Sequence, residues 1–161
     1  MEKVYIGKIV STHGIKGELR ILSDFEFKDK VFIVGNRLIN DDKDYIIKSY
    51  RVHKKFDMVT LNDYKDINEV LFLLKKKVYC FKKDISLSDQ EILDEDLISF
   101  EVISEDGKKG YIQEIFMASE SNKILRVVFD KEVLIPFFSP MVQKIDKNQK
   151  QIYVKLLDGM E

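Results

Sequence analysis

His13 is the residue best suited to acid–base or metal chemistry, because it lies in a glycine-rich loop with Lys16 and Glu18 close by in the sequence. A metal site or a nucleophilic triad needs further partners at defined spacings, and the chain contains only one other histidine, His53, and one cysteine, Cys80. The sequence also lacks the nucleotide-binding loops G-x-x-x-x-G-K-S/T and G-x-G-x-x-G. We therefore expect no catalytic residue, no metal and no cofactor.

The loop around His13 is instead suited to a phosphate. Gly14 and Gly17 can adopt a positive φ or let a partner's backbone come close, and the loop is basic. Its G-x-x-G pattern matches the loop that clamps RNA in KH domains, but that loop joins two helices, whereas this one joins two expected strands. For His13 we expect a loop-stabilising hydrogen bond or a phosphate contact. The candidate RNA contacts are His13, Lys16, Arg20, Lys54 and Lys55.

Short apolar or alternating runs separated by turn residues fill the first half and predict strands. The period then changes, because Asp66 followed three residues later by Glu69 has the pattern of a helix start, and we predict a short helix over 66–75. We interpret Cys80 as a buried strand residue. Five or six short strands with one helix are typical of a compact β-barrel. The predicted strands are 3–10, 18–22, 31–39, 44–52, 58–61 and 78–81.

An acidic segment divides the chain. Residues 84–96 contain six carboxylates and no lysine or arginine, so we predict an acidic linker over 85–96 between domains at 1–84 and 97–161. The second half again predicts short strands, with hairpin turns at 105–108 and 146–149, and thus a second small barrel. Its predicted strands are 97–103, 110–116, 124–129, 133–138, 142–145 and 151–157.

Residues 133–138 are an unbroken apolar stretch, although strict alternation would bury only every second side chain. Some of this stretch must therefore lie outside a single-faced core. It is either buried under the other barrel or the linker, or it forms a surface for a protein partner. The partner-surface candidates are Ile135, Phe137, Phe138 and Met141, together with the apolar pair of the linker, Ile92 and Leu93.

The net charge of −1 hides two halves of opposite sign. Residues 1–84 carry 18 basic and 13 acidic side chains, a net of +5, while residues 85–161 carry 9 and 15, a net of −6. The first half thus favours phosphate-rich partners and the second favours basic ones, unless both are merely solvated surfaces. No apolar run approaches the roughly 20 residues of a membrane span, and the N-terminus has no apolar signal core. We expect a cytoplasmic monomer without membrane contact.

Two sets of residues carry a family resemblance. Ile6-Gly7-Lys8-Ile9 and residues 12–18 resemble the N-terminal signature of the RimM-type ribosome maturation factors. Motifs of the second half are similar, in order and spacing, to the PRC-barrel domain of that family. This resemblance implies an all-β protein with one or two short helices and two small barrels, the first akin to the second domain of translation elongation factors. The second-half motifs are Asp96-Leu97-Ile98, Gly107, Gly110, Asn122, 133–137, 144–146, 152–154 and 158–160.

For function, the resemblance implies a factor without enzymatic activity. Such a factor binds the free or immature 30S ribosomal subunit, engages the head-domain ribosomal protein numbered nineteen, and assists the folding and processing of 16S rRNA. The sequence departs from the family at Ile92-Leu93, where paired aromatics are usual, at Ser99, where glycine is usual, and at Lys123, where an acid is common. Two other classes stay open: a small barrel enzyme that binds a flavin or nucleotide, and a PRC-barrel protein-binding adaptor without an RNA role.

Overall fold

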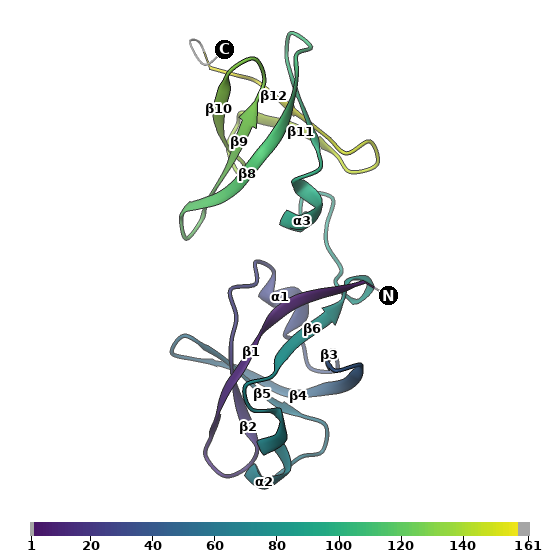
Figure 1. Ribbon diagram of the computed structural model, residues 1–161, viewed down its shortest axis with the longest axis vertical. Helices are drawn as coiled ribbons and strands as arrows, with labels where there is room; N and C mark the ends of the chain where they lie inside the picture. The colour runs from purple at the N-terminus through teal and green to yellow at the C-terminus, as the bar shows by residue number, and fades with distance from the viewer. Residues whose placement is uncertain (1, 158–161) are drawn as a thin grey trace. The chain divides into compact units, whose positions relative to one another are not determined.

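The computed structural model describes residues 2–157, and the last family motif, 158–160, lies outside the described residues. The chain divides at Ser86–Leu87 into two compact units. Each unit is built around one β-sheet with only short helices (Figure 1), so the predicted all-β fold is confirmed. Among the described residues, no helix has the length and apolar character needed to span a membrane.

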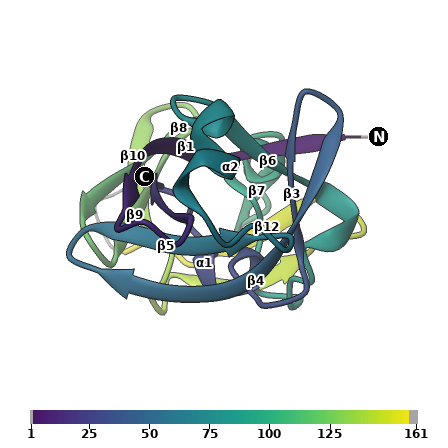
Figure 2. The ribbon, with the colours of Figure 1, turned by 90° about the horizontal axis from the view of Figure 1, so that it is seen from below.

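The first unit is a closed barrel of six antiparallel strands in the order β1-β2-β5-β4-β3-β6. The long hairpin of β4 and β5 is at the lower left in Figure 2. Alternation sets the faces: Leu19 and Ile21 are fully buried, whereas Arg20 between them faces outward. The strands are β1 (Lys3–His13), β2 (Glu18–Leu22), β3 (Arg37–Asn40), β4 (Lys43–His53), β5 (Phe56–Leu61) and β6 (Lys77–Phe81).

Two expected elements of this unit differ from the prediction. The expected strand over 31–39 begins only at Arg37, because α1 (Lys28–Val31) and a turn at Gly35 with φ of 98° precede it. The expected helix over 66–75 is only α2 (Ile67–Val70) followed by the 3-10 turn η1 (Leu71–Leu73). Its start was predicted correctly, since the Asp66 carboxylate accepts a hydrogen bond from the Asn68 amide at 2.8 Å.

The second unit is a six-stranded sheet in the order β10-β9-β8-β7-β12-β11. All its strand pairs are antiparallel except β7 with β12. The 3-10 turn η2 (Lys82–Asp84) ends the first unit, and α3 (Asp94–Leu97) precedes the sheet. The strands are β7 (Glu101–Ser104), β8 (Lys109–Ser119), β9 (Asn122–Val128), β10 (Glu132–Pro136), β11 (Val142–Asp146) and β12 (Gln151–Val154).

The acidic segment after residue 86 packs onto the second unit. Ile92 and Leu93 are each only 5% exposed, and Ile92 belongs to the core of this unit. The Lys147 amine donates to the Ser88 carbonyl, which anchors the middle of the segment. The expectation that Ile92 and Leu93 offer a partner surface is therefore corrected, because Ile92 packs in the core of its own unit and the Leu93 side chain is buried.

Burial also corrects most of the apolar surface predicted after residue 132. Ile135 faces inward by the alternation of β10, and the strand ends at Pro136, where the two-residue period stops. The turn that follows brings Phe137 and Met141 into the same core, at 5% and 9% exposure. Of the four candidates in this stretch, Phe138 alone is exposed, at 66%.

The two neighbouring phenylalanines give a matched test of this assignment. Phe137→Ala removes a core ring, so we expect it to lower the free energy of unfolding by about 3–5 kcal/mol. Phe138→Ala removes an exposed ring and should change it by no more than about 0.5 kcal/mol. Urea unfolding of both variants measures the difference, and equal losses of stability would contradict the assignment.

Candidate nucleic-acid interface

One end of the first barrel gathers basic and imidazole side chains from two hairpins. The β1–β2 hairpin carries His13, and the β4–β5 hairpin carries His53. The two hairpins are neighbours because β2 pairs with β5. As a result the two imidazole rings lie 5.4 Å apart between centroids. We call this set, His13, Lys16, Glu18, Arg20, Arg51, His53, Lys54 and Lys55, the hairpin-tip cluster.

Arg20 fastens the end of β1. Its guanidinium donates to the Thr12 carbonyl at 2.6 Å and to the Ser11 hydroxyl at 3.2 Å. Its other terminal nitrogen is 2.6 Å from His13 Nδ1. Because a guanidinium can only donate, Nδ1 of His13 is the acceptor and carries no proton. His13 thus makes the expected loop-stabilising hydrogen bond, while Arg20 is committed to the hairpin rather than projecting freely.

The glycines of the loop adopt the backbone conformation that the sequence predicted. Gly14 has φ of 69° and Gly17 has φ of 91°, in the left-handed region that side chains disfavour. The Ile15 carbonyl accepts a hydrogen bond from the Ile67 amide at 2.8 Å, so the loop is tied to the start of α2. Lys16 is therefore presented on a fixed turn, with its side chain exposed.

Arg51 and Glu18 form a two-pronged ion pair across the cluster. Arg51 Nε and Nη2 donate to the two carboxylate oxygens of Glu18 at 2.9 and 2.7 Å. These hydrogen bonds lower the pKa of Glu18. The sequence marks Glu18 only as a neighbour of His13, and it does not predict a role for Arg51. The β4–β5 register places Arg51 opposite Met58, and the β2–β5 register places Arg20 opposite the same residue, so Arg51 and Arg20 share one row across the sheet.

His53 lies in surroundings that oppose its protonation. Burial lowers the pKa of His53, and the nearby charges of Arg51, Lys54 and Arg20 lower it further. Its Nδ1 atom is buried and has no hydrogen-bond partner among the described residues. An anion at this end of the barrel would offset the positive charge around the His53 ring, and it would thereby favour the protonated imidazole.

The lysines of the cluster are available to a ligand. Lys54 and Lys55 form the exposed turn between β4 and β5, where Lys54 has φ of 57°. The Lys55 amine lies 5.5 Å from the centre of the Phe56 ring. Over residues 2–157, Lys16, Lys54 and Lys55 make no ion pair. Amines without an ion pair, on the two hairpins that carry His13 and His53, can bind phosphate groups.

The second unit offers a different surface around Lys123, which is only 1% exposed. Its amine lies 2.7 Å from an Asp94 carboxylate oxygen and 5.6 and 5.9 Å from the ring centres of Phe137 and Phe138. A buried lysine needs such partners. The exposed ring of Phe138 therefore lies beside the ion pair of Lys123 and Asp94. Of the apolar residues predicted as a partner surface after residue 132, Phe138 is the one that is accessible to a protein partner.

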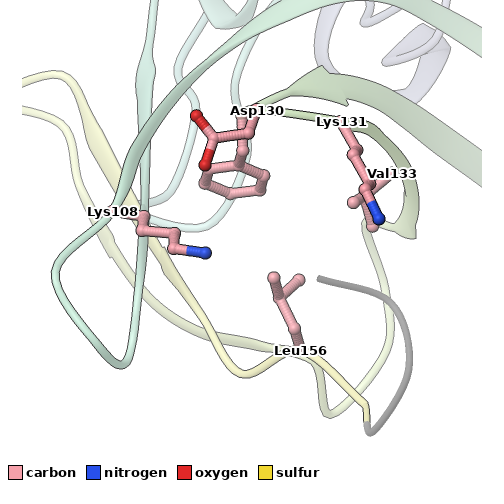
Figure 3. Close-up of a pocket in the computed structure, with 6 residues that line it drawn as sticks. Lys108, Asp130, Lys131, Val133 and Leu156 are labelled. Atoms are coloured by element: carbon pink, nitrogen blue, oxygen red, sulfur yellow. The ribbon is translucent and has the colours of Figure 1, made fainter.

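A cavity of about 170 Å³ opens elsewhere in the second unit, and Figure 3 shows Lys108, Asp130, Lys131 and Leu156 around it. A second cavity of this unit measures about 310 Å³ and lies beside the acidic segment, where Leu87, Ile92 and Lys147 are among the residues that line it. Among the described residues, no group of three His, Cys, Asp or Glu side chains could hold a metal ion.

Comparison with known proteins matches both halves to one family. Residues 4–85 match the model of the RimM N-terminal domain, and residues 94–160 match that of the RimM PRC barrel domain. The chain is 35% identical over 164 residues to a ribosome maturation factor RimM of Ligilactobacillus salivarius, covering 97% of each chain. It is 32% identical over 165 residues to that of Staphylococcus aureus, covering 98% of each.

Two solved structures are also similar. One is a putative 16S ribosomal RNA processing protein RimM of Pseudomonas aeruginosa, with 23% identity, coverage of 97% of this chain and 98% of that one, and a TM-score of 0.48. The other is the N-terminal domain of RimM from Thermus thermophilus, with 19% identity, coverage of 54% and 98%, and a TM-score of 0.47.

The ion pair of the cluster makes a pH-dependent prediction. Replacing Arg51 by Gln removes the cause of the lowered pKa of Glu18, so this pKa should rise toward its ordinary value. A lowered folded-state pKa stabilises the fold above the unfolded-state pKa, and this contribution disappears as the pH falls through the folded-state value. The variant should therefore be less stable than the parent at neutral pH but not in strong acid. Carboxyl NMR titration measures the shift.

The matched control for this titration is Arg126→Gln, which breaks the ion pairs with Glu114 and Glu132 in the second unit. It should leave the pKa of Glu18 unchanged. If Arg51→Gln also left it unchanged, the account of the ion pair would be wrong.

Proposed function

The chain belongs to the RimM family of ribosome maturation factors, and on that premise we propose that it binds the immature 30S subunit and assists the folding and processing of 16S rRNA. The observation that carries the proposal is the match of both halves to the family, in order, along nearly the whole chain. In this proposal the protein acts in the cytoplasm as a monomer and by binding alone.

The hairpin-tip cluster is the proposed RNA contact. It lies on the half with a net charge of +5, and phosphate contacts by lysine supply most of the sequence-independent affinity for RNA. Lys16, Lys54 and Lys55 provide these contacts, with His13 beside them. Arg20 contributes by holding the loop, because its donors are occupied by Thr12, Ser11 and His13.

The second unit is the proposed dock for the head-domain ribosomal protein numbered nineteen. Ribosomal proteins are typically basic, and the half that contains this unit has a net charge of −6. Complementary charge accelerates encounter, while a desolvated aromatic anchor slows dissociation. Phe138 fits the anchor role because its ring is exposed and rests against Phe137, with ring centres 5.0 Å apart.

Gradient sedimentation tests the proposal directly. A tagged chain should migrate with free and precursor 30S particles and not with 70S ribosomes. Phe138→Ala should reduce co-migration with these particles, while Leu134→Ala, at an outward position of β10 that is 44% exposed, serves as the matched control. Migration of the parent chain only at the top of the gradient would contradict the proposal.

The RNA contact has its own test in salt dependence. Replacing Lys16, Lys54 and Lys55 together by Gln removes three proposed phosphate contacts and should reduce the slope of log affinity against log salt by about 2 to 3. The control replaces Lys108, Lys109 and Lys131 of the second unit by Gln and should leave the slope unchanged. Binding assays with pre-30S particles over a salt series measure both, and an unchanged slope in the first variant would refute the contact.

A further inference from the structure

The outer face of β1 and β6, away from the hairpin tips, carries an aromatic pair and a lysine pair. The two strands are antiparallel neighbours, as Figure 1 shows, and their register places Tyr5 opposite Tyr79 and Lys8 opposite Lys77. All four side chains point away from the core, since residues between them, such as Ile6 on β1 and Val78 on β6, are buried. We call these four residues the tyrosine–lysine face.

The tyrosine rings are placed to stack against a flat ligand. Tyr5 is 49% exposed, and its ring centre lies 5.5 Å from that of Tyr79 at an angle of 69°. Neither phenol makes a hydrogen bond to another group among the described residues. An edge-to-face pair of this kind is a favourable aromatic arrangement, and the exposed ring of Tyr5 is accessible to a flat ligand.

The lysine pair is an arrangement that the fold alone disfavours. Like charges directly opposite each other on neighbouring strands destabilise a sheet. Over residues 2–157, neither Lys8 nor Lys77 has an ion-pair partner. An anion bound between the two amines would remove this repulsion.

The lysines on this face also differ in their ion pairing along the strands. Beyond the tyrosines on one side, two lysines are paired, since Lys3 pairs with Asp42 at 2.6 Å and Lys82 with Glu2 at 3.3 Å, and the Lys83 amine lies 5.8 Å from the centre of the Phe81 ring. On the other side, the backbone of Lys75 and Lys76 hydrogen bonds to Ile9 of β1 and extends the basic row beyond Lys8 and Lys77. Lys8 and Lys77 therefore lie on the side of the aromatic pair on which the basic row continues.

We propose that the tyrosine–lysine face binds a single-stranded segment of RNA, with one base stacked on the tyrosines and the adjoining phosphates on Lys8 and Lys77. Stacking on an exposed ring requires an unpaired base, which a duplex does not offer. The unpaired lysines repel a basic ribosomal protein, so charge favours RNA over such a partner at this face. The proposal rests on the RNA role proposed above and adds a second contact of defined ligand class.

The test uses the full chain and a mixed-sequence single-stranded RNA of about 12 nucleotides that carries one fluorescent purine. The parent chain should bind this probe more tightly than a duplex of the same length, and stacking should quench the purine. Tyr5→Leu/Tyr79→Leu should weaken binding about tenfold or more and abolish the quenching, with the salt slope unchanged. The control Tyr111→Leu removes a tyrosine that is 58% exposed on β8 of the second unit and should have no effect.

The lysines give an independent readout. Lys8→Gln/Lys77→Gln should reduce the salt slope by about 1.4 for single-stranded RNA and, because it relieves the repulsion, should raise the thermal stability of the free protein. Its control is Lys109→Gln/Lys131→Gln. An RNA contact predicts that the lysine variant gains stability while it loses affinity, which a structural role for these residues does not.

Three results would overturn the inference. The first is unchanged probe binding by the tyrosine variant. The second is preference of the parent chain for the duplex. The third is loss of 30S association by the tyrosine variant while its probe binding stays intact, a result that would identify a protein contact instead. Sedimentation with 30S particles keeps the two proposals apart. If the parent chain sediments with 30S particles but does not bind the probe, this inference fails and the proposed function stands.

Discussion

Closure of the first barrel depends on β1, the strand that hydrogen bonds to both β2 and β6. Its pairing shifts register between Tyr5 and Gly7 on one side and between Ile9 and Ser11 on the other. Gly7 is required between these irregularities, because a Cβ atom there would lie 2.6 Å from the Leu22 carbonyl oxygen. Both proposed RNA surfaces follow from this strand: its end carries His13, and its outer face carries Tyr5 and Lys8.

The second unit depends on a different constraint, the burial of one amine. Lys123 can be buried at 1% exposure because Asp94 neutralises it and two phenylalanine rings lie beside it. This ion pair also joins α3 to the start of β9, so the acidic segment is fixed to its own sheet. The departure from the family pattern at Lys123 thus has a structural consequence, since an acid at this position would face Asp94 with like charge.

Periodicity predicted most of the strands, because alternation along a sheet is a local property of the sequence. The predicted strand boundaries were least accurate where an apolar run extends beyond the strand at one end. Residues 31–39 and 133–138 both continue in apolar residues past a helix or a turn, and only the tertiary fold decides which of these side chains are buried. The glycine conformations at positions 14 and 17 were predictable from residue type. The contacts of Arg51 and the pairing of Lys8 with Lys77 were not, since they depend on strand register.

The central claim is that this chain acts in the maturation of 16S rRNA. The most direct measurement maps both ends of 16S rRNA in a strain that lacks the gene for this protein and in the same strain carrying it on a plasmid. The account predicts unprocessed 16S ends and an excess of free 30S particles in the deletion strain, with both corrected by the plasmid. Normal 16S ends and a normal ratio of 30S to 70S particles in the deletion strain would contradict it.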